Sequence, residues 1–128
     1  WWLALAHGAG TNSNAPLLVA VAEALEQHGI STLRIDLPFR QARAKGPPFP
    51  AQAAADRAGI RAAIAHLRSL GAAKVAIGGH SYGGRQASML ASEDPAAASA
   101  LLLISYPLHP PGQPEKPRTA HFPDLRTP

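Results

Sequence analysis

The chain has 128 residues, enough for one small domain with a hydrophobic core, and it has no cysteine, which excludes disulfide bonds and thiolate metal sites. Its 46% hydrophobic and 16% charged residues are typical of a globular protein and exclude an intrinsically disordered one. The formal net charge is +4, but the basic residues are scattered, and the one local cluster (Arg40, Arg43 and Lys45) is interpreted as a solvated loop rather than a nucleic-acid-binding patch.

The first predicted element is a buried strand over residues 1–6, because this short run is wholly apolar and leads into the glycine-rich loop 7–10. A helix follows, with Asn14 predicted as its N-cap, Pro16 in its first turn and Gly29 as its end. Its apolar residues recur at helical spacing on one face: Leu17, Leu18, Val21, Ala22 and Leu25.

Residues 31–37 predict a second strand, because apolar and polar side chains alternate along them. The stretch 38–50 contains four prolines, and we expect it to be a loop with no long regular element. A second helix is predicted over 52–70, with Gly71 as its end. Its apolar positions have the helical period: Ile60, Ala63, Ile64 and Leu67.

The most informative stretch is 74–85. Residues 75–77 form a short apolar run closed by glycines, which predicts a buried strand. The next five residues, Gly79-His80-Ser81-Tyr82-Gly83, match the pattern Gly-x-Ser-x-Gly, and the residues after them favour a helix that ends near Glu93. A serine on a tight turn between a strand and a helix is the nucleophile elbow of α/β-hydrolases.

A fourth apolar strand is predicted within residues 99–106. Strands that alternate with helices predict right-handed crossovers, and therefore a mostly parallel sheet with helices on both faces, which is a three-layer α/β sandwich. The remainder, 107–128, holds seven of the 13 prolines and is predicted to be loop, with at most a short helical turn in 119–125. We treat 1–128 as a single domain.

Ser81 is the candidate nucleophile. The turn lifts its hydroxyl above the sheet, and glycine at positions 79 and 83 removes the side chains that would clash there. A serine also needs backbone amides that stabilise the oxyanion, a general base, and a group that orients the base. In an elbow of this kind one amide belongs to the residue after the nucleophile, here Tyr82, whose ring is expected to line the acyl pocket.

The second amide is expected from Ala9, in a loop that begins His-Gly after an earlier strand. Gly8 and Gly10 would let that loop approach the substrate, and His7 is interpreted as a residue that hydrogen-bonds the loop rather than transferring a proton. His80 is expected to point away from the nucleophile and to support the turn.

The sequence supplies no convincing base. Glu115 and His121 follow Ser81 in the right order, but both lie in a proline-rich loop, and a triad needs rigid supports. His109 and His121 are therefore interpreted as packing or lining residues near the mouth of the site. Asp36, at the end of a strand, is predicted to form an ion pair with Arg34 or Arg85.

Several stretches together resemble a known family. They are His7 to Gly10, Arg34 to Phe39, Gly78 to Arg85, Ser105 to Gly112 and Arg118 to Pro123. In that order they are similar to the α/β-hydrolase family of the testis-expressed-thirty and NSL-complex third-subunit type, in its bacterial branch. The similarity covers essentially the whole chain, and the last two stretches are more specific than the elbow, because no general rule of the fold demands them.

The resemblance implies a serine hydrolase of the α/β-hydrolase fold that acts on an ester, thioester or amide bond through an acyl-enzyme on Ser81. It implies Ala9 and Tyr82 as oxyanion donors. Members of this family continue with further strands that carry the catalytic acid and histidine, so the C-terminal strands are expected to be missing from these residues, and the fragment is expected to be inactive alone. The alternative is a non-catalytic protein-interaction domain on the same fold, as in one branch of the family.

Other classes of function are disfavoured. His80 stands where a dinucleotide-binding Gly-x-Gly-x-x-Gly motif needs a glycine, and the six histidines show no paired metal-ligand spacing. We therefore expect no cofactor, no metal and no nucleic-acid partner, and a small acyl compound as substrate. No apolar run approaches the ~20 residues of a membrane span, and the absence of cysteine suits a reducing compartment, so a cytoplasmic location is expected.

Overall fold

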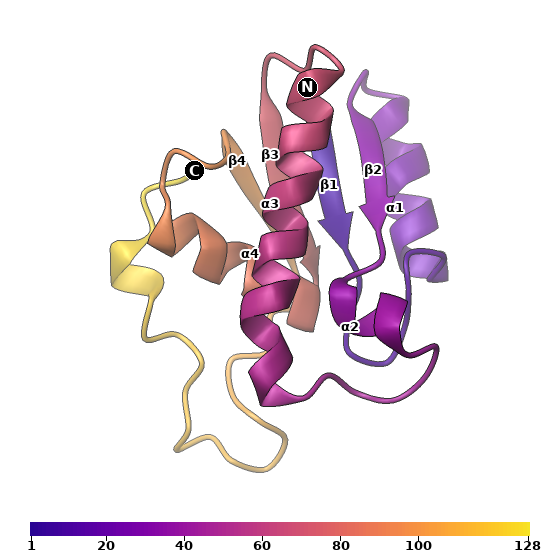
Figure 1. Cartoon of the computed structure of the whole chain (residues 1–128). Helices are drawn as coiled ribbons and strands as arrows, with labels where there is room; N and C mark the ends of the chain where they lie inside the picture. The colour runs from indigo at the N-terminus through magenta and orange to yellow at the C-terminus, as the bar shows by residue number, and fades with distance from the viewer.

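Four parallel strands form one sheet in the order β2-β1-β3-β4 (Figure 1). The computed structural model describes all 128 residues. The strands are β1 (Trp2–Ala6), β2 (Ser31–Ile35), β3 (Val75–His80) and β4 (Ala100–Ile104). The helices are α1 (Pro16–Glu26), α2 (Pro38–Ala42), α3 (Ala53–Ser69) and α4 (Tyr82–Glu93), with short 3-10 turns at Pro50–Gln52 and Phe122–Asp124.

The helices cover both faces of the sheet, as Figure 1 shows, with α3 and α4 in front and α1 behind. Side chains of β1 alternate between these layers: Leu3 and Leu5 pack with Leu18 of α1, while Ala4 and Ala6 join the larger core under α3 and α4. The predicted three-layer α/β architecture with a parallel sheet is confirmed.

The register of the sheet brings the carboxyl ends of its strands together. Ala6 of β1 lies beside Ile35 of β2 on one side and Gly79 of β3 on the other, and His80 lies beside Ile104 of β4. The loops that follow these strands therefore share one edge, which is where ligands bind in open α/β sheets.

Helix α2 lies in the proline-rich stretch that the sequence predicts as loop. Pro38 fits the first helical position because its fixed φ is already helical and its missing N–H is not needed there. The N–H of Phe39 donates to the carboxylate Oδ1 of Asp56 in α3 (3.0 Å), so a side chain from another helix caps this one. A five-residue helix held by a distant cap has too little local signal to be predicted.

The prediction of Asn14 as the N-cap of α1 is wrong. Pro16 occupies the first helical position, which makes Ala15 the N-cap, and no side chain bonds the free amides of that end. The Asn14 side chain instead accepts a hydrogen bond from Arg34 of β2 (3.3 Å).

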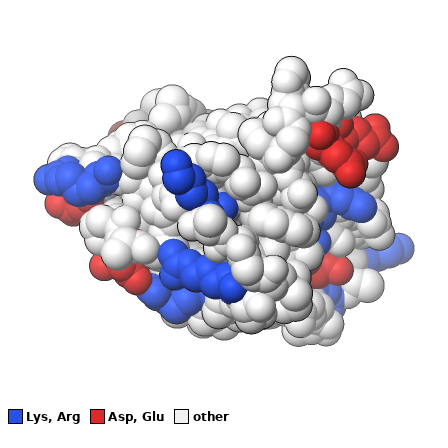
Figure 2. Space-filling model, turned by 90° about the horizontal axis from the view of Figure 1, so that it is seen from above, with Lys and Arg blue, Asp and Glu red and all other residues white.

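Charge is dispersed over the end of the molecule at which the strands begin. Figure 2, viewed from above, shows Lys and Arg side chains in separate groups, with uncharged surface between them and acidic groups beside some of them. None of the helices combines the length and the apolar composition that crossing a membrane requires.

Candidate active site

Ser81 connects β3 to α4 in a backbone conformation that is strained for a residue with a side chain (φ 50°, ψ −114°). Its N–H donates to the carbonyl of Ile104 in β4 (2.8 Å), and its carbonyl accepts from the N–H of Arg85 (3.0 Å). The turn is therefore held from the neighbouring strand and from the first turn of the helix.

Gly79 and Gly83 are required by close backbone approach. A Cβ on Gly79 would lie 2.7 Å from the carbonyl oxygen of Ala6, and one on Gly83 would lie 2.5 Å from that of His7. Both neighbours are backbone atoms of β1 or its loop and cannot move aside cheaply. The elbow and the loop 7–10 are thus in direct contact at the carboxyl edge of the sheet.

Ala9, Ser81 and Tyr82 line one hollow of about 450 Å³. The backbone N–H of Ala9 donates to no acceptor in the protein. Tyr82 is the first residue of α4, where backbone N–H groups have no partner within the helix. Two residues that line the same hollow as Ser81 therefore have backbone amides without an acceptor in the protein.

His7 is fully buried and holds the loop that carries Ala9. Its Nδ1–H donates to the carbonyl of Gly8 (2.7 Å), and its Nε2 accepts from the N–H of Leu37 (3.0 Å). With both ring nitrogens occupied, the imidazole ties the loop after β1 to the segment after β2. Gly8 packs against the His80 ring, which would lie 3.0 Å from a Cβ there, whereas Gly10 has open space around it.

The interpretation of the basic cluster as a solvated loop is wrong for Arg40, which is buried. Its guanidinium donates to the carbonyls of Thr11 (2.8 Å), Ala9 (2.9 Å), Gly46 (3.0 Å) and Arg43 (3.1 Å). The guanidinium thus supplies hydrogen-bond donors to backbone carbonyls of two loops. It also holds the carbonyl of Ala9, which belongs to the peptide group that follows the free N–H of this residue.

Asp56 is a buried carboxylate beneath the elbow that sequence reasoning missed. Its Oδ2 accepts from the phenol of Tyr82 (2.6 Å), and its Oδ1 accepts from the N–H of Phe39. Burial and this hydrogen bond raise the pKa of Tyr82 above its ordinary value, so the phenol stays a donor. The available signal was position: Asp56 precedes Ile60 by one helical turn and continues the apolar face of α3.

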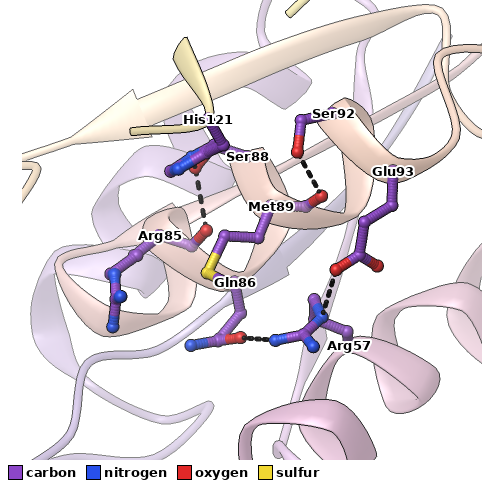
Figure 3. Close-up of polar contacts among 8 residues, drawn as sticks. All are labelled: Arg57, Arg85, Gln86, Ser88, Met89, Ser92, Glu93 and His121. Carbon is purple, nitrogen blue, oxygen red and sulfur yellow. Dashed lines mark hydrogen bonds and ion pairs between the residues drawn. The ribbon is translucent and has the colours of Figure 1, made fainter. Parts of the chain in front are cut away.

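No histidine lines the hollow. The Nε2 of His121 lies 2.7 Å from the Oγ of Ser88 on α4 (Figure 3), and exposed His109 contacts the carbonyl of Pro110. His121 is therefore a packing residue that fastens the C-terminal segment to α4, which is one of the two roles predicted for it, and neither of these histidines lines the hollow. No group of three acidic or histidine side chains is placed to hold a metal ion.

The predicted ion pair of Asp36 is also wrong. Asp36 is exposed just past the end of β2, and its carboxylate accepts from the N–H of Ser13 (2.8 Å). Arg34 donates to the carbonyl of that same Ser13. The two charged side chains bind opposite ends of one loop residue instead of each other, because the chain turns away after Ile35.

The lowered pKa values of two histidines lead us to expect that the free energy of unfolding depends on pH. Burial lowers the pKa of His7 and of His121 below the ordinary 6.5, with Arg85 adding to the effect at His121. The unfolded chain binds protons more readily, so the free energy of unfolding should be at its full value above pH 6.5 and fall as the pH drops below it. Urea unfolding at about pH 7.5 and about pH 5 measures this, and His121→Gln should reduce the difference. Exposed His66→Gln is the control, and an unchanged pH difference in His121→Gln would contradict the assignment.

Comparison with known proteins is consistent with this geometry. A family model described as an alpha/beta hydrolase domain matches residues 2–128, whereas no curated protein matches. A dienelactone hydrolase from Anabaena variabilis is similar in structure (TM-score 0.63, 26% identity, covering 82% of this chain and 51% of that one). The alpha/beta hydrolase GrgF from a Penicillium species is also similar (TM-score 0.68, 21% identity, covering 89% of this chain and 40% of that one). The same holds for the pyrethroid hydrolase PytH (TM-score 0.62, 22% identity, covering 84% of this chain and 40% of that one). The chain thus spans about half the length of these structures, or less.

Proposed function

Because the chain belongs to the alpha/beta hydrolase domain family, we propose that it forms the nucleophile half of a serine hydrolase that cleaves an ester, thioester or amide bond through an acyl-enzyme on Ser81. One observation carries this proposal. The strained serine and the free amide of Ala9 line the same hollow, next to the first amide of α4. Backbone strain alone also occurs at Ser105, so the proposal rests on the strain at Ser81 together with the amides that belong to residues of the same hollow.

In the proposed reaction the Oγ of Ser81 attacks the substrate carbonyl and gives up its proton to a general base. The carbonyl oxygen becomes an oxyanion, which accepts hydrogen bonds from the N–H groups of Ala9 and Tyr82. When the intermediate collapses, the leaving group departs with a proton and the acyl group stays on Ser81. Water then attacks the ester, and the same steps in reverse release the acid and the free serine.

We propose that the general base and the acid that orients it come from outside residues 1–128, and that these residues alone do not turn over substrate. None of the six histidines of the chain lines the hollow or hydrogen-bonds Ser81. The similar solved structures are also considerably longer.

We further propose that the protein belongs to the testis-expressed-thirty and NSL third-subunit type within the family. The two stretches specific to that resemblance are joined in the structure. The phenol of Tyr106 donates to the carbonyl of Arg118 (2.6 Å), and the N–H of Arg118 donates to the carbonyl of Leu108 (2.7 Å). This pairing supports a common role for the two stretches beside the hollow.

The test is covalent labelling with a fluorophosphonate probe. In the protein expressed at its natural full length, we expect one adduct, which peptide mass spectrometry assigns to Ser81. Ser81→Ala should not be labelled, whereas Ser92→Ala, which changes a serine on the same helix outside the hollow, should be labelled like the wild type. A folded full-length protein that stays unlabelled would contradict the proposal and favour the non-catalytic interaction domain.

A further inference from the structure

One wall of the hollow carries an arginine that has no partner in the protein. Arg85 follows Ser81 by one turn of α4, so it lies on the same side of the helix, about 6 Å further along the axis. Its side chain makes no hydrogen bond or ion pair, although its Nε is shielded from solvent. In Figure 3 the one contact drawn to Arg85 ends on its backbone carbonyl, and the guanidinium stands apart.

Gln86, the next residue, has an unused donor at the same place. The side chain is fully buried and lines the hollow. Its Oε1 accepts from Arg57 (2.9 Å), while its Nε2 has no partner. Figure 3 shows that this nitrogen points away from Arg57, to the side on which the Arg85 guanidinium lies. Buried amide groups of folded proteins nearly always have an acceptor, so this donor is free to bind a ligand atom in the hollow.

The positive charge on this side of the hollow is not paired with a carboxylate. Arg118 lines the hollow as well, its guanidinium makes no hydrogen bond or ion pair, and no Asp or Glu is among the lining residues. The nearby carboxylates are engaged elsewhere: Glu93 pairs with Arg57 (3.1 Å), and Asp56 accepts from Tyr82. Hydrogen-bond donors of Arg85, Gln86 and Arg118 therefore lie on one side of the hollow with no acceptor from the protein.

We propose that this wall, formed by Arg85, Gln86 and Arg118, binds an oxyanion group of the substrate, a carboxylate or a phosphate. The planar fork of an arginine suits either group, and the amide nitrogen of Gln86 supplies one further donor. This inference rests on the proposed function of Ser81 and narrows it. The preferred substrate is an ester that carries a negative charge about one helical turn from the bond that is cleaved.

A matched pair of substrates tests this preference. The full-length protein is assayed with the para-nitrophenyl monoester of adipic acid and with the para-nitrophenyl ester of hexanoic acid, which has the same carbon chain without the charge. We expect kcat/KM to be about tenfold or more higher for the adipate ester, and Arg85→Gln to bring the ratio close to one. Arg61→Gln, which changes an exposed arginine of α3 outside the hollow, should keep the wild-type ratio.

A binding measurement separates the anion site from the chemistry. Ser81→Ala protein is titrated calorimetrically with adipate and with inorganic phosphate, and the stronger ligand identifies which oxyanion the wall prefers. Adding Arg85→Gln should weaken that binding about tenfold. Absence of turnover with both esters, together with intact anion binding, would overturn only the proposed function. No anion binding, or a preference unchanged by Arg85→Gln, would overturn the anion site itself.

Discussion

In the full-length protein, replacing Ser81 with glycine is expected to abolish turnover and at the same time to stabilise the fold. Loss of the proposed nucleophile should lower kcat by at least about 10⁴-fold. The backbone at Ser81 (φ 50°, ψ −114°) is the mirror image of an extended conformation, which glycine adopts as readily as its normal form. Relief of this strain outweighs the greater freedom of glycine in the unfolded chain, so the free energy of unfolding should rise by about 1 kcal/mol.

Two other serines provide controls for that experiment. Ser105 also has a positive φ (50°) and lies outside the hollow, so Ser105→Gly should stabilise the protein without loss of activity. Ser92 lies within α4, where glycine is unfavourable, so Ser92→Gly should cost about 1 kcal/mol. Urea unfolding and ester hydrolysis measure both effects. A Ser81→Gly protein less stable than the wild type would show that the elbow stores no strain.

Sequence reasoning was most successful where local pattern determines structure. The four strands, α1, α3 and α4 all have a period or an apolar run that indicates their type, and the predictions agree with the structure. The contacts of Gly79 and Gly83 agree as well, because a nucleophile elbow places the same constraint on every chain that forms one.

The predictions that were wrong or absent concern polar side chains whose partners are distant in sequence. Arg40 bonds carbonyls of the loops before and after it, and Asp56 bonds a phenol from α4. Such contacts depend on three-dimensional proximity: the position of Asp56 on the apolar face of α3 indicated burial, but neither for Asp56 nor for Arg40 did the sequence indicate the partner. The ion pair expected for Asp36 failed for the same reason, since both side chains found backbone partners on one loop. Polar networks under the site therefore had to come from the structure.

Replacing Asp56 with alanine is expected to give the largest loss of stability in this set. The carboxylate is fully buried, and its removal leaves the phenol of Tyr82 and the N–H of Phe39 without acceptors in the core. Two unsatisfied donors and a small cavity should together cost about 3–4 kcal/mol. Labelling of Ser81 should slow about tenfold or more, because Tyr82, whose amide is a proposed oxyanion donor, loses the anchor of its side chain.

A double-mutant cycle with Tyr82→Phe identifies the pair as the cause. Tyr82→Phe alone leaves the carboxylate one donor short, while the double variant removes the donor and the acceptor together. The sum of the two losses of unfolding free energy in the single variants should therefore exceed the loss in the double variant by about 1–2 kcal/mol. Asp94→Ala, at the exposed end of α4, also breaks a contact to an α3 residue, Arg61, but should change stability little, because that pair lies in solvent. If Asp56→Ala behaved like Asp94→Ala, the Asp56 carboxylate would have no part in holding the turn at Ser81. The position of Tyr82 would then depend on the backbone contacts of Gly79 and Gly83 alone.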